Sequence, residues 1–235
     1  MKIEILYPEV CGLYGDRQNA VYLEKTLPEA EFIYTDLNTE PYFVKHIPDI
    51  IYIGSMSEEM QRKVLGIFMP LRDRIAELVD NGTVFLATGN AAELFGEKIV
   101  YVTEKKEAKA LGLFPLTTKT DLFKRYNGKV LGKSEGIDIV GFRSQFSFMY
   151  GDNSDCYFLK MERGDGINKE SKYEGMRKNN LICTTCLGPI LPLNPLFTEY
   201  IISLAGEKAE AAYKAEAMDA YNKRLSEFKD PKVKF

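Results

Sequence analysis

The sequence predicts an α/β protein with a central, mostly parallel sheet and helices on both of its faces. Strand-like and helix-like segments alternate with short turns over the first hundred residues, which is the pattern of a doubly wound sheet. The segment Pro48–Gly54 is apolar at most positions, as parallel strands covered on both faces are. For a chain of 235 residues, one main domain is the simpler expectation.

The elements of this half follow in order from the N-terminus. Ser55, with Glu58 three residues later, resembles a capping box and predicts the start of a long helix. Pro70 should kink this helix or split it in two, and Asn81-Gly82 should end it. The other expected elements are a helix at Arg17–Leu27 and strands at Ile3–Tyr7, Glu31–Leu37, Pro48–Gly54 and Thr83–Thr88.

From about residue 99 the pattern changes to short strand-like segments with glycine turns, some of them expected to be antiparallel. Loops are expected at Gly164-Asp165-Gly166 and Lys178-Asn179-Asn180, and helices at Asn194–Ala205 and Glu207–Phe228. The last helix has an imperfect apolar face, which either packs on the rest of the chain, as we favour, or offers a docking surface. The expected strands are Lys129–Leu131, Ile137–Phe142, Phe146–Tyr150, Tyr157–Met161 and Leu181–Thr185.

Composition narrows the possible classes of function. The net charge of −3 argues against general binding to nucleic acid or anionic membranes. No apolar run approaches the roughly 20 residues of a membrane span, and the N-terminus lacks the organisation of a signal peptide. We therefore expect a cytoplasmic protein whose four cysteines are reduced thiols.

Few side chains are available for catalysis or metal binding. His46 is the only histidine, so a His-rich metal site is excluded, and its place before Pro48 predicts a surface loop. Cys183 and Cys186 form a Cys-x-x-Cys pair, but at the end of a predicted strand they are better explained as buried thiols than as a redox or metal site. We expect no metal and no cofactor.

A turn after the fourth strand is the most informative feature. The apolar run Thr83–Ala87 is followed by a glycine and a short helical segment within Leu86–Gly96. This is the strand, sharp turn and helix of a nucleophile elbow, in which a Ser or Cys occupies a strained position. The residue at that position is Gly89, so the frame of a hydrolase is predicted without its nucleophile.

Three blocks of sequence occur in a recognisable order. They are Leu6–Asn19, then Pro48–Gly54 with Leu86–Gly96, and finally Gly188–Pro195. Together they resemble class I glutamine amidotransferase-like proteins of the cobyric acid synthase branch, most closely the glutaminase subunits of lipid II isoglutaminyl synthases. The resemblance implies a flavodoxin-like sandwich with a central, mostly parallel sheet. It also implies one amidotransferase-like domain over residues 1–206 and a C-terminal helical extension over 207–235.

In the family, a cysteine thiolate attacks the carboxamide of glutamine, a histidine transfers the proton, and backbone N–H groups stabilise the oxyanion. The resemblance aligns that cysteine with Gly89 and that histidine with Leu187. The oxyanion turn keeps Gly54 but continues Ser55-Met56-Ser57, and a Gly-Phe-Glu-Asn-His segment becomes Gly141-Phe142-Arg143-Ser144-Gln145. We therefore expect no catalytic residue at these positions and no glutamine hydrolysis by the family mechanism.

The former active site could be filled or reused for binding. Gly89 begins a helical segment, whose free N–H groups favour an anion, whereas Glu93 adds negative charge. Met56 and Leu187 add apolar bulk. We favour a collapsed or repurposed pocket over one that binds a carboxylate, a phosphate or an uncleaved glutamine-like ligand. The candidate binding residues are Gly54, Asn90, Glu93, Asp16, Arg17, Asn19, Arg125 and Arg143.

Some of these candidates also have a structural explanation. Asp16 could cap the following helix and Arg17 could form a local ion pair, although with Asn19 they could equally keep a surface role. Arg125 and Arg143 lie in segments that border the family's pocket, where they could hold an anionic group.

Two functions remain open. The first is a catalytically inactive binding or regulatory subunit, for which the resemblance implies a Mur-ligase-like partner or self-association. The second is an enzyme with a non-thiol active site that uses carboxylates such as Glu93 or Glu174 for amide hydrolysis or transfer. The first predicts no release of ammonia from glutamine, whereas the second predicts release that no cysteine substitution abolishes.

Overall fold

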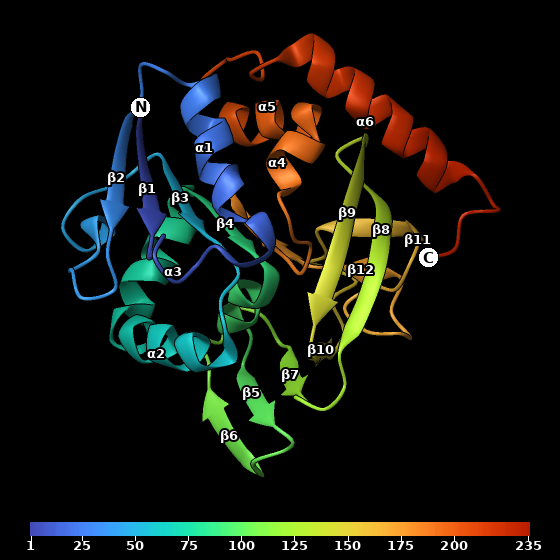
Figure 1. Ribbon diagram of the computed structural model, residues 1–235. Coiled ribbons are helices and arrows are strands. Elements are labelled where there is room, and N and C mark those ends of the chain that lie inside the picture. Colours follow the sequence, from blue (N-terminus) through green and yellow to red (C-terminus); the bar gives the residue numbers. More distant parts are fainter.

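The computed structural model describes all 235 residues, which form three β-sheets and the helices around them (Figure 1). The central sheet has six strands in the order β13-β14-β4-β3-β1-β2. All neighbours in it are parallel except β13 and β14. Its strands are β1 (Lys2–Leu6), β2 (Glu31–Thr35), β3 (Ile50–Ile53), β4 (Val84–Thr88), β13 (Met176–Lys178) and β14 (Leu181–Thr184).

Helices pack on the central sheet through two separate apolar cores. One core joins Ile3, Ile50 and Ile182 to α1 (Arg17–Thr26), α4 (Ile190–Leu193) and α5 (Pro195–Leu204). The other joins Leu6, Ile51 and Cys183 to α2 (Glu58–Phe68) and α3 (Arg72–Asp80). Neighbouring residues of a strand point to opposite faces, which is why Ile50 and Ile51 enter different cores. The predicted α/β class is confirmed, and the sheets are mixed rather than purely parallel.

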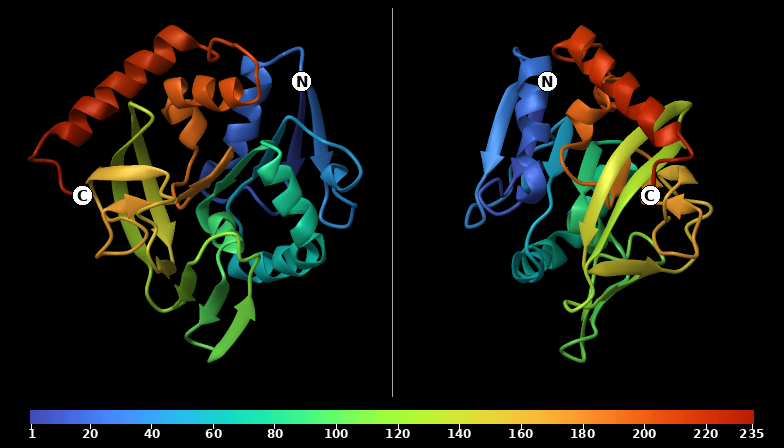
Figure 2. Two further views of the ribbon diagram at one scale, coloured as in Figure 1. Left: turned by 180° about the vertical axis from the view of Figure 1, so that it is seen from behind. Right: turned by 45° about the vertical axis from the view of Figure 1, so that its right-hand side comes forward.

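Two four-stranded sheets extend from this core, in the orders β10-β7-β5-β6 and β12-β11-β8-β9. The first contains β5 (Lys98–Tyr101), β6 (Lys106–Lys109), β7 (Thr117–Thr120) and β10 (Ser147–Tyr150). The second contains β8 (Tyr126–Ser134), β9 (Ile137–Gln145), β11 (Leu159–Arg163) and β12 (Tyr173–Glu174). Strands β5, β6, β7, β12 and β13 are absent from the sequence prediction, because they are short and several carry charged residues. The β5–β6 hairpin projects from the body of the molecule (Figure 2).

The C-terminal helix packs on the chain's own sheet. Helix α6 (Lys214–Lys229) begins seven residues later than the predicted Glu207, after Tyr213 at φ +53°. Tyr221 and Phe228 are buried against the β8–β9 hairpin, and the Tyr221 hydroxyl donates to the carbonyl of Asp138 at 2.8 Å. The apolar face of α6 is therefore occupied within the chain, and Figure 2 shows the helix lying across the ends of β8 and β9.

Three local predictions can be compared with the structure. Pro70 lies in the 3-10 turn η3 (Met69–Leu71), which separates α2 from α3 as expected. The N-cap of α2 is Ser57, whose hydroxyl accepts from Met60 N at 3.3 Å, so the predicted cap at Ser55 is wrong. His46 is exposed and stacks on Tyr42 with 4.2 Å between the ring centroids, which confirms its predicted place on the surface.

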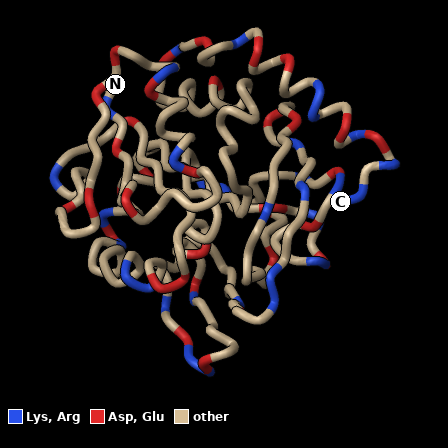
Figure 3. Tube along the Cα trace, viewed as in Figure 1, with Lys and Arg blue, Asp and Glu red and all other residues tan.

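Charged residues of both signs are distributed around the whole trace (Figure 3). None of the helices combines the length and the apolar character needed to cross a membrane. No cluster of three or more His, Cys, Asp or Glu side chains is arranged to hold a metal ion.

Candidate functional site

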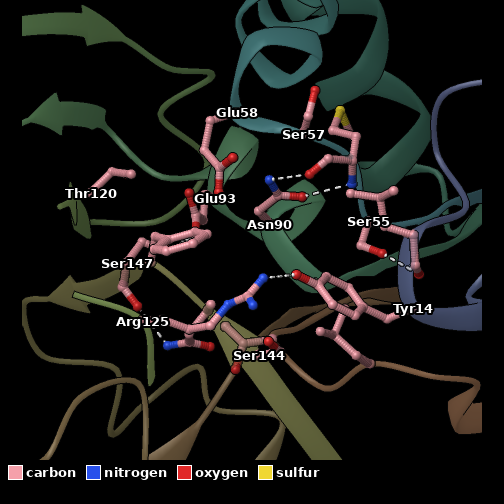
Figure 4. A pocket seen from close by; sticks show the side chains of 17 residues that line it. Tyr14, Ser55, Ser57, Glu58, Asn90, Glu93, Thr120, Arg125, Ser144 and Ser147 are labelled. Carbon is pink, nitrogen blue, oxygen red and sulfur yellow. Dashed lines mark hydrogen bonds between the residues drawn. The ribbon is translucent and has the colours of Figure 1, made fainter. Parts of the chain in front are cut away.

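The candidate site is a cavity at the carboxyl ends of the parallel strands, where open α/β sheets place their ligand sites, and we call it the main cavity. It has a volume of about 210 Å³ and is closed on its other side by β7, β10 and the loop before β8. The central sheet contributes the loops after β1, β3, β4 and β14. Figure 4 shows the side chains around the cavity, which are those of Leu13, Tyr14, Ser55, Met56, Ser57, Glu58, Gly89, Asn90, Glu93, Thr120, Arg125, Ser144, Gln145, Phe146, Ser147, Thr185 and Leu187.

Gly89 occupies the predicted elbow but has no room for a side chain. Its φ is +60°, the left-handed region that favours glycine. A Cβ atom on Gly89 would lie 2.6 Å from Cδ2 of Leu187 and 2.6 Å from Cβ of Ser55. The elbow continues into the 3-10 helix η4 (Gly89–Phe95) instead of an α-helix. The predicted space for an anion at Gly89 is therefore absent, because neighbouring side chains fill it.

The turn after β3 is tied to the rest of the protein by its own amides. Ser55 N donates to Oδ2 of Asp16 at 2.9 Å, and Met56 N donates to Oδ1 of Asn90 at 2.9 Å. Asn90 returns a bond from Nδ2 to the Met56 carbonyl at 2.8 Å. Gly89 N donates to the Cys186 carbonyl at 3.3 Å. These three N–H groups are consequently not available to a developing oxyanion, which needs unoccupied donors.

Asp16 connects several loops at this edge of the sheet. Its buried carboxylate accepts from Ser55 N, from the Thr88 hydroxyl at 2.6 Å and from Gly188 N at 3.0 Å. Burial raises the pKa of Asp16, and these hydrogen bonds oppose the rise. The side chain forms no bond to the start of α1, so the predicted helix cap is not its role. Asp16 instead holds the loops after β3, β4 and β14 together.

Asn19 and Arg17 differ in burial, although both belong to α1. Asn19 is fully buried, donates to the Tyr52 hydroxyl at 2.9 Å and accepts from Leu191 N at 2.9 Å. Arg17 is exposed and lines a separate hollow beside α1. Gly54 is also outside the main cavity, because a Cβ there would lie 2.5 Å from the carbonyl oxygen of Cys11. Of this N-terminal group of candidates, none faces the cavity.

Glu93 provides a buried carboxyl in the wall of the cavity. It is 3% exposed and accepts from Gln61 Nε2 at 2.7 Å and from the Ser147 hydroxyl. Gln61 Nε2 also donates to the Asn90 carbonyl at 2.7 Å. Burial raises the pKa of Glu93 to about 7, although both hydrogen bonds lower it. The group can therefore change its protonation state near neutral pH.

Arg125 and Tyr14 meet across the cavity mouth. Nη2 of Arg125 donates to the Tyr14 hydroxyl at 2.7 Å, and the guanidinium lies 5.0 Å from the centre of the Phe146 ring. Figure 4 shows the two side chains pointing toward each other from different elements. Arg125 forms no salt bridge, so its charge remains available to a ligand.

Arg143 and Glu174 form a buried pair behind the site. Nη2 of Arg143 lies 3.7 Å from Oε1 of Glu174, and Nη1 donates to the Gly166 carbonyl at 2.7 Å. Glu174 accepts from the Thr184 hydroxyl and from the amide and hydroxyl of Thr185, at 2.8 to 3.0 Å. Neither side chain lines the cavity. The structure therefore brings together Asn90, Glu93 and Arg125 from the predicted binding set.

The sequence offered no signal for several residues of the site. Ser147 and Thr120 belong to strands β10 and β7, where they are paired in register, and only β10 was expected. Gln61 is one of several polar residues on α2, and its bond to Glu93 joins positions far apart in the sequence. A positive φ of +56° at Tyr14 places that ring at the mouth, and nothing in the residue type indicates this conformation.

Comparison with known proteins identifies the chain's relatives. No protein-family model matches it. It is 27% identical over 173 residues to the GatD subunit of lipid II isoglutaminyl synthase (glutamine-hydrolyzing) from Staphylococcus aureus, covering 73% of this chain and 69% of that protein. It is 22% identical over 213 residues to the GatD subunit from Streptococcus pneumoniae, covering 88% and 81%. The chain is therefore similar in sequence to GatD subunits.

Solved structures agree with this at the level of the fold. A glutamine amidotransferase structure matches with a TM-score of 0.56 and 13% identity over 87% of this chain and 99% of that one. A Thermotoga maritima glutamine amidotransferase matches with a TM-score of 0.51 and 9% identity over 98% of this chain and 86% of that one. PurLQS from the same organism matches with a TM-score of 0.52 and 11% identity over 95% of this chain and 98% of that one. The fold is similar to that of glutamine amidotransferases.

Proposed function

We propose that this chain is a GatD homologue that does not hydrolyse glutamine and that acts as a binding or regulatory subunit. The observation that carries the proposal is the packing at the elbow, where Leu187 and Ser55 fill the place of a side chain on Gly89. Because Gly89 aligns with the family's cysteine and Leu187 with its histidine, the leucine fills the space of the lost nucleophile. We infer that the nucleophile and the base were lost together. We also propose that the chain belongs to the cobyric acid synthase branch and has the flavodoxin-like sandwich of that branch.

The remaining machinery supports the same proposal. A thiolate mechanism needs a nucleophile, a base and free donors for the oxyanion. The Cys186 thiol is buried, and burial raises its pKa to about 12, which leaves almost no thiolate at neutral pH. The amides of Ser55 and Met56 already donate to Asp16 and Asn90.

The cavity beside the filled elbow supports a binding role. Asn90, Glu93 and Arg125 line a space of about 210 Å³, and we propose that Arg125 holds an anionic group of the ligand. We assign the other predicted residues a supporting part: Asp16 and Asn19 fix the loops, while Arg17, Gly54 and Arg143 lie outside the cavity.

A carboxylate enzyme is the second candidate. Glu93 favours it, because a carboxyl with a pKa of about 7 suits general acid–base work near neutral pH. Glu174 gives it no partner, since that side chain is buried against Thr184 and Thr185. Glu58 also lines the cavity, but no hydrogen bond or salt bridge positions it for proton transfer, so we rank this function below the binding role.

The decisive measurement is glutamate release from L-glutamine by the purified chain, alone and with a Mur-ligase-like subunit from the same organism. We expect no release in either case, nor from Gly89→Cys, whose thiol would need the volume of Leu187. The double variant Gly89→Cys with Leu187→His places both the cysteine and the histidine of the family at these positions and is the matched comparison. Release by the wild-type chain would overturn the proposal, and its loss in Glu93→Gln would establish the carboxylate enzyme instead.

The partner can be tested in the same preparation. GatD is named as a subunit, so we propose a stable complex with a Mur-ligase-like protein in preference to self-association. Light scattering during size-exclusion chromatography should give the mass of a heteromeric complex. A homodimer that excludes the ligase would contradict this assignment. The cytoplasm remains the proposed compartment, because all four cysteines are free thiols.

A further inference from the structure

The inner wall of the main cavity carries negative charge without a counter-ion. Glu93 and Glu58 both line the cavity, and repulsion from Glu58 contributes to the raised pKa of Glu93. Neither residue takes part in any salt bridge of the chain. A buried carboxylate without a cation is costly, and Glu93 is 3% exposed.

Two unpaired polar atoms in the same wall are a second observation that points to ligand binding. Thr120 lines the cavity and is 3% exposed, yet its hydroxyl oxygen has no hydrogen-bond partner. Oε1 of Gln145, which also lines the cavity, has none either. Thr120 is paired in register with Ser147, whose hydroxyl donates to Glu93. Buried polar atoms are almost always paired, so two unsatisfied acceptors beside a carboxylate require explanation.

We propose that this cavity binds a small organic cation, an ammonium or guanidinium group held by Glu93 and Glu58 with Thr120 and Gln145 as further acceptors. The inference deepens the proposed function, since it rests on the cavity being a binding site and names the ligand's chemistry. Ammonium and guanidinium groups carry several N–H donors and no acceptor, which matches a wall of carboxylate, amide and hydroxyl oxygens. With Arg125 at the mouth for a carboxylate, the fitting class is a basic amino acid.

The surrounding charges permit this assignment. Tyr14 and Arg125 lie at the mouth of the cavity. Tyr101 lies near Glu93, and the negative charge of Glu93 contributes to the raised pKa of Tyr101. Arg62 packs over the Tyr101 ring at 4.0 Å and is paired with Glu104, so it does not neutralise Glu93. The elbow side of the cavity carries the apolar side chains of Met56 and Leu187.

Calorimetric titration of the full chain with L-arginine and with its uncharged isostere L-citrulline tests the cation directly. L-Lysine against L-norleucine repeats the comparison with an ammonium group. We expect each cationic ligand to bind roughly 10- to 100-fold more tightly than its neutral isostere, since hydrogen bonds to a charged group supply the difference. Equal binding within a pair, or no binding of either cation, would overturn the proposal.

Variants separate a role of Glu93 in binding from one in folding. Glu93→Gln should remove the preference for arginine over citrulline. Thr120→Val should lower the affinity for arginine and leave the affinity for citrulline unchanged. Glu59→Gln is the matched control, because Glu59 lies next to Glu58 on α2 but is exposed and pairs with Lys63. Circular dichroism of each variant checks the fold, and an unchanged arginine preference in folded Glu93→Gln contradicts the assignment.

The pH dependence gives a second readout. A cation favours the ionised form of Glu93, whose pKa without ligand is about 7, so affinity for arginine should rise with pH through neutrality. We expect roughly tenfold weaker binding at pH 6 than at pH 8 in the wild type, and no such change in Glu93→Gln. Glutamate release from glutamine would contradict the proposed function without affecting this comparison of isosteres, so the two failures can be told apart.

Discussion

The methyl group of Leu187 stands where a side chain on Gly89 would begin, with Cδ2 2.6 Å from the position of a Cβ. The backbone that carries Leu187 is fixed independently, because Leu187 N donates to the Phe142 carbonyl at 2.8 Å. The backbone of Leu187 therefore cannot move away from Gly89 without disturbing β9. If the elbow is inactive as we propose, this contact is the reason why Gly89→Cys alone should not give a working nucleophile.

Gly89→Ala should destabilise the fold by about 1–3 kcal/mol, from the strained φ and from overpacking against Leu187 and Ser55. Urea denaturation measures the change. Leu187→Ala in the same chain should recover part of the loss, which a double-mutant cycle would report as coupling. Gly66→Ala is the control: no atom lies within 4 Å of a Cβ there, and alanine in a helix should stabilise. Equal effects at both glycines would contradict the packing argument.

Glu93 should make stability depend on pH. Its folded pKa of about 7 exceeds the ordinary value of 4.5, so the folded state binds the proton more tightly than the unfolded chain. Stability from this group is complete below pH 4.5 and declines as the pH rises to about 7, by about 3 kcal/mol. Glu93→Gln should remove this decline, as urea titrations at pH 5 and pH 8 would show. A parallel decline in both proteins would assign the effect to other groups.

Replacing Asp16 should loosen the loops around the cavity. In Asp16→Asn the new NH2 group must face a donor, either Gly188 N or the Ser55 amide and the Thr88 hydroxyl. We expect this to lower the free energy of unfolding by about 2–4 kcal/mol. Chemical denaturation gives the loss, and hydrogen exchange at Ser55 and Gly188 gives its location. Asp219→Asn, on the α6 surface, is the control. Slow exchange at both amides in a folded Asp16→Asn protein would exclude the organising role.

The Cys-x-x-Cys pair should behave as core thiols. Cys183 and Cys186 are fully buried, and burial raises the pKa of both. Iodoacetamide should label the half-buried Cys156 in the native protein, and the other three thiols only after unfolding, as mass spectrometry of peptides would resolve. Stoichiometric zinc binding or early labelling of Cys186 would contradict this.

Arg163 should hold the C-terminal tail. Its guanidinium donates to the carbonyls of Phe228 at 2.6 Å, Asp230 at 2.7 Å and Val233 at 2.5 Å, and lies 4.2 Å from the Phe235 ring. Arg163→Ala should release residues 230–235 to protease and lower stability by about 1–3 kcal/mol. Lys160→Ala, on the same strand, is the control. Protection of the tail in Arg163→Ala would show that α6 alone retains it.

The sequence by itself predicted the order of strands and helices where hydrophobic patterning is strong. Continuous apolar runs identified β3 and β4, and Pro70 correctly marked the break between α2 and α3. The resemblance read from the sequence also led us to expect Gly89 and Leu187 in place of a nucleophile and a base. It failed where patterning is weak: β6 (Lys106–Lys109) reads Lys-Glu-Ala-Lys, and the start of α6 depends on a left-handed Tyr213.

Only the tertiary structure decided what became of the site. Whether Gly89 leaves a hole or a filled corner depends on Leu187, nearly a hundred residues away, and the sequence alone could not choose between those outcomes. The burial that raises the pKa of Glu93 to about 7 also depends on tertiary structure, as does its hydrogen bond with Ser147, which requires β10 to fold beside η4. Local patterning fixes elements because their periodicity is written in neighbouring residues. Burial and charge environment depend on residues distant in the chain, so they exist only once the chain has folded.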